Sequence, residues 1–204
     1  MNISMFVEFP EDISLRILST LLELKSVNLL DTSFCNSKVR NYVLDLYRSP
    51  LLTFKGEHSE TRNCIVRYIG LRGLKLSELV VDSASFEVIF ENNIDTSKVT
   101  SICESADYTT EGSAVHWIEL INSCPKLTNL EMCGGSWLGE SVLLQQVDVR
   151  ILQQLKVLKI RQLSKDGSVS LLAVVCHKLV DCELCLNEEH AKILFENNRN
   201  IENV

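Results

Sequence analysis

The sequence predicts an α/β solenoid of short strand–turn–helix repeats, preceded by a small helical head. A spaced apolar pattern recurs beyond Pro50, stretches with helical spacing lie between its copies, and the pattern is absent before Pro50. With 204 residues and a hydrophobic content of 46%, the chain can bury a stable core. We therefore expect a head over residues 1–49 and a repeat region over residues 50–204.

Composition argues against several classes of protein. The net charge of −7 is modest and spread along the chain, which disfavours binding to nucleic acid or to an anionic membrane. No apolar run approaches the roughly 20 residues of a membrane span, and MNISMFVEFPED lacks the basic start and apolar stretch of a signal peptide. The eight cysteines are scattered, so we expect reduced core side chains in a cytoplasmic or nuclear protein.

Residues 10–50 have the pattern of three short helices. Pro10 suits the first turn of the first helix, Ser26 can cap the second, and Pro50 stops the third. Each helix carries an apolar stripe: Ile13, Ile17, Leu18, Leu21 and Leu22; then Val27, Leu29 and Leu30; then Val39, Tyr42, Val43, Leu46 and Tyr47. Because so short a bundle buries little surface, we expect it to pack on the first repeat, on a partner protein or on both.

The pattern beyond Pro50 has the form L-x-x-L-x-L, with other apolar residues allowed at the key positions. The clearest copies begin at Leu127 (LTNLEM), Leu155 (LKVLKI) and Leu179 (LVDCEL). Less regular copies begin at Leu51, Leu76, Val99 and Ile201. Successive starts lie 25, 23, 28, 28, 24 and 22 residues apart, a range that brackets the period of about 20–29 residues of leucine-rich repeats. Each copy predicts one strand, whose apolar face is buried only against neighbouring repeats.

The stretches between these copies predict helices. Helical spacing covers residues 113–123, with an apolar stripe of Val115, Ile118, Leu120 and Ile121, and residues 141–152 and 168–176. Cys124 and Cys176 each lie three residues before a first Leu, in the similar segments CPKLTNLEMCGG and CHKLVDCELCLN. We expect a small apolar side chain to pack there, at the end of the helix.

Two further features bear on the repeats. FENN occurs at residues 90–93 and 195–198, each time before a strand-like start, which supports the period. The final residues, IENV from Ile201, open a new copy without a polar cap after it. We expect either that the chain is a fragment of a longer repeat protein or that a partner covers this end.

CPKLTNLEMCGG resembles the cysteine-containing type of leucine-rich repeat, which is common in the substrate-binding arms of F-box proteins. Residues 9–42 resemble an F-box. Phe9-Pro10-Glu11 matches its hydrophobic residue, Pro and acid, Ile17-Leu18 and Leu21 match its Ile-Leu pair and following Leu, and Val27, Leu30 and Arg40 fall at later positions. Phe34 and Cys35 lie near the place where many F-boxes carry a Trp.

This resemblance implies a substrate-recognition adaptor of a cullin-type ubiquitin ligase. The head would dock on the adaptor Skp1, and the repeat arm would bind a protein substrate. The head residues implied in docking are Phe9, Pro10, Ile13, Ile17, Leu18, Leu21, Val27 and Leu30. The alternative is a repeat scaffold for protein interactions whose N-terminal helices only cap the solenoid.

The sequence offers no catalytic constellation, so we expect a protein without enzymatic activity or cofactor. It contains no P-loop, no G-x-G-x-x-G and no G-x-S-x-G, and GGSWLG at 134–139 misses the last by its spacing. The one metal-like cluster is Cys182 and Cys185 with His177 and His190 nearby. Because odd spacing along a strand sends side chains to opposite faces, we expect no metal site there.

The fifth position of each repeat is expected to point away from the core, toward the predicted concave face of the solenoid. Parallel strands lie about 4.8 Å apart, so charged residues at this position would form an alternating ladder. One interpretation is cross-strand pairing worth a few tenths of a kcal/mol per pair; the other is a surface that binds a protein. The fifth-position residues are Val80, Cys103, Glu131, Lys159 and Glu183. The candidate binding residues are Glu131, Lys156, Lys159, Arg161, Asp181 and Glu183.

Overall fold

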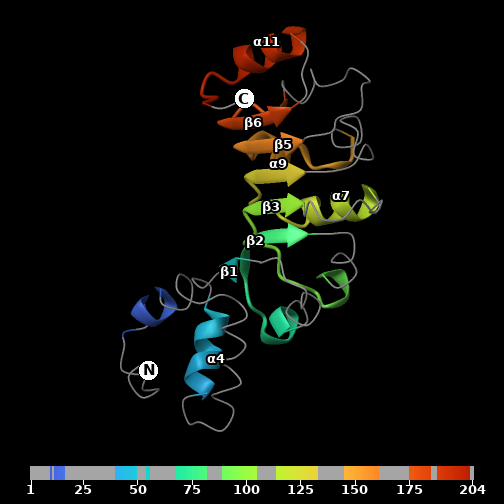
Figure 1. Cartoon of the computed structure of the whole chain (residues 1–204). Helices are drawn as coiled ribbons and strands as arrows, with labels where there is room; N and C mark the ends of the chain where they lie inside the picture. Colours follow the sequence, from blue (N-terminus) through green and yellow to red (C-terminus); the bar gives the residue numbers. More distant parts are fainter. Residues whose placement is uncertain are drawn as a thin grey trace. The chain divides into compact units, whose positions relative to one another are not determined.

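The protein is α/β, as predicted, with parallel strands and several helices (Figure 1). The chain divides into two compact units: unit 1 comprises Met1–Leu79 and Glu87–Lys98, and unit 2 comprises Val80–Phe86 and Val99–Val204. Among the residues that the structure describes, no helix is long and apolar enough to cross a membrane. The computed structural model describes residues 10, 12–16, 40–49, 54–55, 68–81, 89–104, 114–132, 145–160, 175–184 and 188–202.

Two helical segments of the predicted head are described in unit 1. Residues 12–16 are helical, and α4 covers Arg40–Arg48. The stripe predicted for α4 is confirmed at Val43, Leu46 and Tyr47, which are at most 3% exposed. The hydroxyl of Tyr42 donates a hydrogen bond to Ser14 Oγ at 3.4 Å, which joins α4 to residues 12–16. The predicted second helix lies outside the described residues.

The two described strand segments of unit 1 are parallel. Strand β1 (Phe54–Lys55) pairs with β2 (Leu76–Val81), and Phe54 lies opposite Leu76. The sequence pattern aligned Leu51 with Leu76, so this predicted register is wrong by three residues. The reason lies in the segment LLTFKG, whose apolar residues Leu51, Leu52 and Phe54 do not fix one alternation.

Two tight helix ends shape the rest of unit 1. The helix over residues 68–72 ends at Gly73, with φ +62°, and the one over 89–91 ends at Asn93, with φ 49°. Each end carries the same two backbone bonds, which are those of a left-handed C-cap. The two segments approach closely, because a Cβ on Gly70 would lie 2.7 Å from the Asn92 carbonyl oxygen.

The described part of unit 2 contains four parallel strands in chain order (Figure 1). They are β3 (Ser101–Glu104), β4 (Asn129–Met132), β5 (Val157–Ile160) and β6 (Asp181–Leu184). The first residue of each strand lies opposite the first residue of the next, at steps of 28, 28 and 24 residues. These are the steps between the sequence copies from Val99 to Leu179, so this predicted register is confirmed.

The inward side chains of these strands form the core of unit 2 in layers. The fourth position of each copy gives one layer and the first position gives another. The fourth-position residues are Ile102, Leu130, Leu158 and Cys182, and the first-position residues are Val99, Leu127, Leu155 and Leu179; all are at most 1% exposed. Each residue therefore packs where the L-x-x-L-x-L pattern placed it.

The predicted helix over residues 113–123 is confirmed as α7 (Ala114–Asn122), and residues 145–146 and α9 (Val149–Gln154) are helical around the predicted range 141–152. Residues 168–174 of the third predicted helix lie outside the described residues. Helix α7 precedes β4 and buries Trp117, at 1% exposed. Val115, which the predicted stripe included, is 56% exposed, because the buried face of α7 is centred on Trp117. Helix α9 is capped by Asp148, and α11 (Glu188–Asn197) follows β6.

A shared turn leads into each strand of unit 2. Cys124 and Cys176 are fully buried three residues before the first Leu, as predicted. Leu152 and Asn198 occupy the same place before Leu155 and Ile201, and both are at most 2% exposed. The two FENN segments are not equivalent, however, because Asn93 ends a helix in the left-handed region whereas Asn198 is buried in this turn. Their similarity therefore does not mark the repeat, contrary to the prediction.

Candidate functional site

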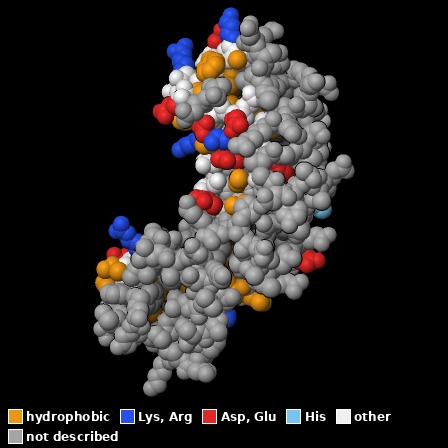
Figure 2. All heavy atoms as spheres, in the orientation of Figure 1, with side chains coloured by type: hydrophobic (Ala, Val, Ile, Leu, Met, Phe, Trp, Pro, Cys, Tyr) orange, Lys and Arg blue, Asp and Glu red, His pale blue; other side chains and the backbone are white. Residues whose placement is uncertain are grey.

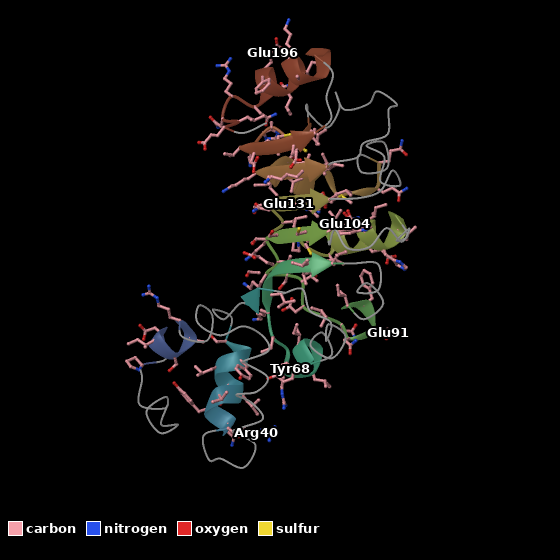
Figure 3. All side chains as sticks on the ribbon, in the orientation of Figure 1. Arg40, Tyr68, Glu91, Glu104, Glu131 and Glu196 are labelled. Carbon is pink, nitrogen blue, oxygen red and sulfur yellow. The ribbon has the colours of Figure 1, made fainter. Side chains whose placement is uncertain are left out.

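The outward side chains of β3 to β6 form the candidate site of unit 2. They lie in two rows, which we call the strand face, and each is partly or largely exposed. The first row is Ser101, Asn129, Val157 and Asp181, and the second is Cys103, Glu131, Lys159 and Glu183. Acidic and basic side chains gather over these strands in Figure 2, and Glu131 is labelled in Figure 3.

Lys159 lies at the centre of the charged residues on the strand face. Its Nζ is 2.9 Å from Asp181 Oδ2 and 3.8 Å from Glu131 Oε1. The side chains of Lys159, Glu131 and Asp181 are 27%, 37% and 28% exposed, so solvent reaches all three. Lys159 thus bridges β4 and β6 through their carboxylates.

The electrostatic surroundings favour the charged form of this lysine. The hydrogen bond to Asp181 raises the pKa of Lys159, burial slightly opposes this, and the charges of Glu131, Asp181 and Glu183 add to it. Three carboxylates thus surround one ammonium, and the four side chains together carry a net charge of −2. The strand face is negatively charged over β4–β6 and uncharged at Ser101 and Cys103 on β3.

The structure places the sequence-predicted face residues in three ways. Glu131, Lys159 and Glu183 lie directly opposite one another, as the predicted ladder requires. Lys156 was expected on the same strand, but it precedes β5, and its exposed side chain lies outside the two rows. Arg161 lies outside the described residues.

Sequence reasoning placed Asp181 beside the ladder without identifying it as the closest partner of Lys159. Asp181 lies opposite Val157, two residues before Lys159, so the contact is diagonal across two strands. Diagonal neighbours are within reach of long side chains. The sequence therefore already indicated this ion pair, because Asp181 lies two residues before Glu183.

The candidate metal cluster is only partly described. Cys182 points inward from β6 in the place of a repeat Leu, as predicted, and burial raises the pKa of its thiol to about 12. Cys185 lies outside the described residues, and His177 is exposed on the turn before β6. Within the described ranges, no three His, Cys, Asp or Glu side chains are grouped to hold a metal ion.

The predicted docking residues of the head are described only in part. Pro10 is exposed, and Ile13 is 44% exposed, whereas Ser14 and Leu15 beside it are buried. The helix over residues 12–16 therefore presents Ile13 away from the core of its unit. Six predicted docking residues lie outside the described part of the chain: Phe9, Ile17, Leu18, Leu21, Val27 and Leu30.

Comparison with known proteins identifies no family for this chain. No protein-family model matches the chain, and no curated protein matches it.

Proposed function

We propose that the protein is a non-enzymatic recognition adaptor that acts inside the cell. Its repeat region is a leucine-rich-repeat solenoid whose strand face binds a protein substrate. Its N-terminal helices are a three-helix, F-box-like head that docks on a Skp1-like adaptor of a cullin ubiquitin ligase. The two activities lie on different parts of the chain, so they can be tested separately.

One observation supports the proposal that the repeat region binds a protein substrate. Strands β3 to β6 keep one register over steps of 28, 28 and 24 residues, with the same position buried in each. This register puts one outward residue from every strand into a common row. A solenoid of such units presents an extended surface of separate side chains, which suits the binding of a protein segment.

The exposure of Ile13 supports the proposal that the head docks on a Skp1-like adaptor. An apolar side chain that is 44% exposed, next to the buried Leu15, is available for a partner. Ile13 also falls in the segment that resembles the F-box, three residues after Pro10.

Isothermal titration of the full chain with a purified Skp1 homologue tests the head. We expect Ile13→Asp to weaken binding by at least about tenfold, because burial of one such apolar side chain is worth about 1.5–3 kcal/mol. Leu71→Asp is the matched control, since Leu71 is 83% exposed and lies outside the motif. Folded protein that binds no Skp1 homologue would remove the adaptor role and leave the repeat scaffold.

A further inference from the structure

We propose that the turns leading into β4, β5 and β6 form a further interaction surface of unit 2, and that this surface binds an acidic segment of a partner protein. We call these three turns, residues 124–128, 152–156 and 176–180, the turn edge. The turn edge is separate from the strand face, so this inference goes beyond the proposed function. It depends on the charge of the turns, on the exposure of their lysines and on their stacking.

The turn edge is basic in an acidic protein. Its three segments, CPKLT, LQQLK and CHKLV, contain three lysines and no Asp or Glu, whereas the whole chain has a net charge of −7. The lysines are Lys126, Lys156 and Lys178, and the side chain of each is exposed. The turn edge thus presents three ammonium groups to solvent.

These ammonium groups are not neutralised by neighbouring carboxylates. None of the three lysines forms an ion pair in the described part of the chain. Asp181 directly follows the third turn, but its carboxylate lies 2.9 Å from Lys159. The next turn along the chain, residues 198–202, contains both Arg199 and Glu202 and adds no net charge. Complementary charge therefore favours a ligand that carries carboxylates.

Hydrogen bonds hold the three turns in register. The Lys156 N–H donates to the Thr128 carbonyl at 2.7 Å, and the Val180 N–H donates to the Lys156 carbonyl at 2.8 Å. The Gln154 side chain adds a bond between the first two turns, because its Nε2 donates to the Pro125 carbonyl at 2.9 Å. The backbone under the lysines is thus fixed before a ligand binds, which lowers the entropy cost of binding.

The stacking of the turns sets the spacing of the charges. Lys126 and Lys178 each directly precede the first Leu of their copy, and Gln154 holds that position in the turn between them. Neighbouring parallel strands are about 4.8 Å apart, so the two lysine backbones are about 10 Å apart, the span of about three residues of extended peptide. Two acidic residues three positions apart in a ligand therefore match Lys126 and Lys178, with Lys156 on the turn between them.

A short acidic segment suits the turn edge better than a long polyanion. At physiological salt, charges separated by more than about 8 Å are largely screened, so a few carboxylates on these turns interact mainly with the three lysines. A nucleic acid or an anionic membrane extends past the turns and meets a chain whose net charge is −7. The ligand class is therefore an acidic stretch of protein.

Fluorescence titration of the full chain with labelled peptides tests this inference. The probe is a peptide of about nine residues with two glutamates three positions apart, and the control peptide has glutamines at the same positions. We expect the glutamate peptide to bind more tightly and its affinity to fall as salt is raised above the physiological level. A single-stranded oligonucleotide of similar length is the competing probe and should bind less tightly than the glutamate peptide.

Substitution of single lysines locates the binding surface. Lys126→Met and Lys178→Met should each weaken binding of the glutamate peptide by about two- to fivefold, whereas Lys126→Arg keeps the charge and should retain the affinity. Lys192→Met is the matched control, because this side chain is 76% exposed on α11 and already pairs with Glu196 at 3.9 Å. It should leave the affinity unchanged, and circular dichroism checks that every variant is folded.

Three results would each overturn the inference: equal affinity for the two peptides, tighter binding of the oligonucleotide, or equal effects of Lys126→Met and Lys192→Met. The titration involves neither Skp1 nor the strand face. It can therefore fail while the proposed function stands, and it can succeed while the proposed function fails.

Discussion

Among single residues, Asn198 shows how a buried amide can join two segments of unit 2. Its side-chain oxygen accepts a hydrogen bond from the Leu179 backbone N–H at 3.0 Å, and its Nδ2 donates to the Leu194 carbonyl at 3.1 Å. The side chain is 2% exposed, so water cannot replace either partner. Asn198 thus fastens the turn after α11 to the start of the β6 segment.

We expect Asn198→Ala to lower the free energy of unfolding by about 1–3 kcal/mol, because it leaves the buried Leu179 N–H without its acceptor. Urea denaturation measures this loss, and hydrogen exchange at the Leu179 amide should become faster. Asn197→Ala is the control: its exposed side chain bonds the Ile193 carbonyl of its own helix, so its effect should be much smaller. Equal losses in the two variants would contradict the role of Asn198.

Lys159 predicts a specific dependence of stability on pH. Its pKa is raised above the usual 10.5, mainly by the hydrogen bond to Asp181. A raised lysine pKa contributes stability that is fully present below the unfolded value and is lost as pH rises through the folded value. Wild type should therefore exceed Lys159→Met in stability by at most about 1 kcal/mol at neutral pH. Denaturation at a series of pH values should show this difference shrinking above pH 10.5; a constant difference would refute the assignment.

The candidate site was predictable to the extent that strand alternation fixes side-chain direction. The pattern put Glu131, Lys159 and Glu183 in one row, and the register confirms it. The pattern wrongly put Lys156 on the strand, because a repeat pattern does not show at which residue the turn ends and the strand begins. Salt-bridge distances also depend on rotamers, which the sequence does not specify.

At the scale of elements, the strands of unit 2 were easier to predict than its helices. A strand needs only the short alternation of Leu130 with Met132, or Leu158 with Ile160, and its neighbours repeat the same signal. Within the predicted helix over residues 141–152, residues 145–146 are helical and α9 begins separately at Val149, because Asp148 caps a new helix there; residues 141–144 lie outside the described part of the chain. In α7 the predicted Ile118, Leu120 and Ile121 are buried, but the wide apolar face led the pattern to include the exposed Val115 and to miss the buried Trp117.

The helix over residues 68–72 depends on a glycine for its packing. A Cβ at position 70 would lie 2.7 Å from the Asn92 carbonyl oxygen and 3.3 Å from Ile94 Cδ1. We expect Gly70→Ala to destabilise the protein by about 1–3 kcal/mol, because the backbone clash exceeds the gain in helix propensity of about 1 kcal/mol. Thermal denaturation measures this effect. Leu71→Ala, at an 83% exposed neighbour, should change stability by less than about 0.5 kcal/mol; a stabilised Gly70→Ala would show that the segments separate easily.

For the whole molecule, the regular register of unit 2 predicts that one repeat can be removed. Deletion of residues 127–154 joins Lys126 to Leu155, so that α7 leads into β5 through the turn that now leads into β4. Strand β3 would then pair with β5, with Ser101 opposite Val157. We expect a folded monomer with a smaller dependence of unfolding free energy on urea, because less surface is exposed on unfolding.

Deletion of residues 127–140 is the control for this experiment, since it removes half a period and places the polar residues Ser141 and Gln146 where the first and sixth apolar residues belong. That variant should lose its cooperative transition, as followed by circular dichroism. Two deletions with the same outcome would show that register does not organise unit 2.

The sequence predicted the α/β class and the pairing of β3 to β6 because a repeated pattern supplies several independent estimates of one register. It failed at β1, where a single irregular copy aligned Leu51 instead of Phe54 with Leu76. The head had no repetition to support it, and its implied docking residues depend on resemblance alone. The fold could therefore be predicted from the residues only where the sequence pattern repeats.

Backbone hydrogen bonds of one kind join the turn before each strand of unit 2 to the next turn, and the Thr128 hydroxyl adds a bond to the Thr100 carbonyl at 3.2 Å. The Thr100 carbonyl accepts from Thr128 N and Asn129 N, the Thr128 and Lys156 carbonyls accept in the same way from the next turns, and the Val180 carbonyl accepts from Glu202 N. Because the repeated bonds are between backbone groups, this position holds Thr, Lys, Val or Glu with the same backbone pairing. Spin labels or crosslinkers attached at positions 128, 156 and 180 would therefore form a molecular ruler, graduated at about 4.8 Å by the strands themselves.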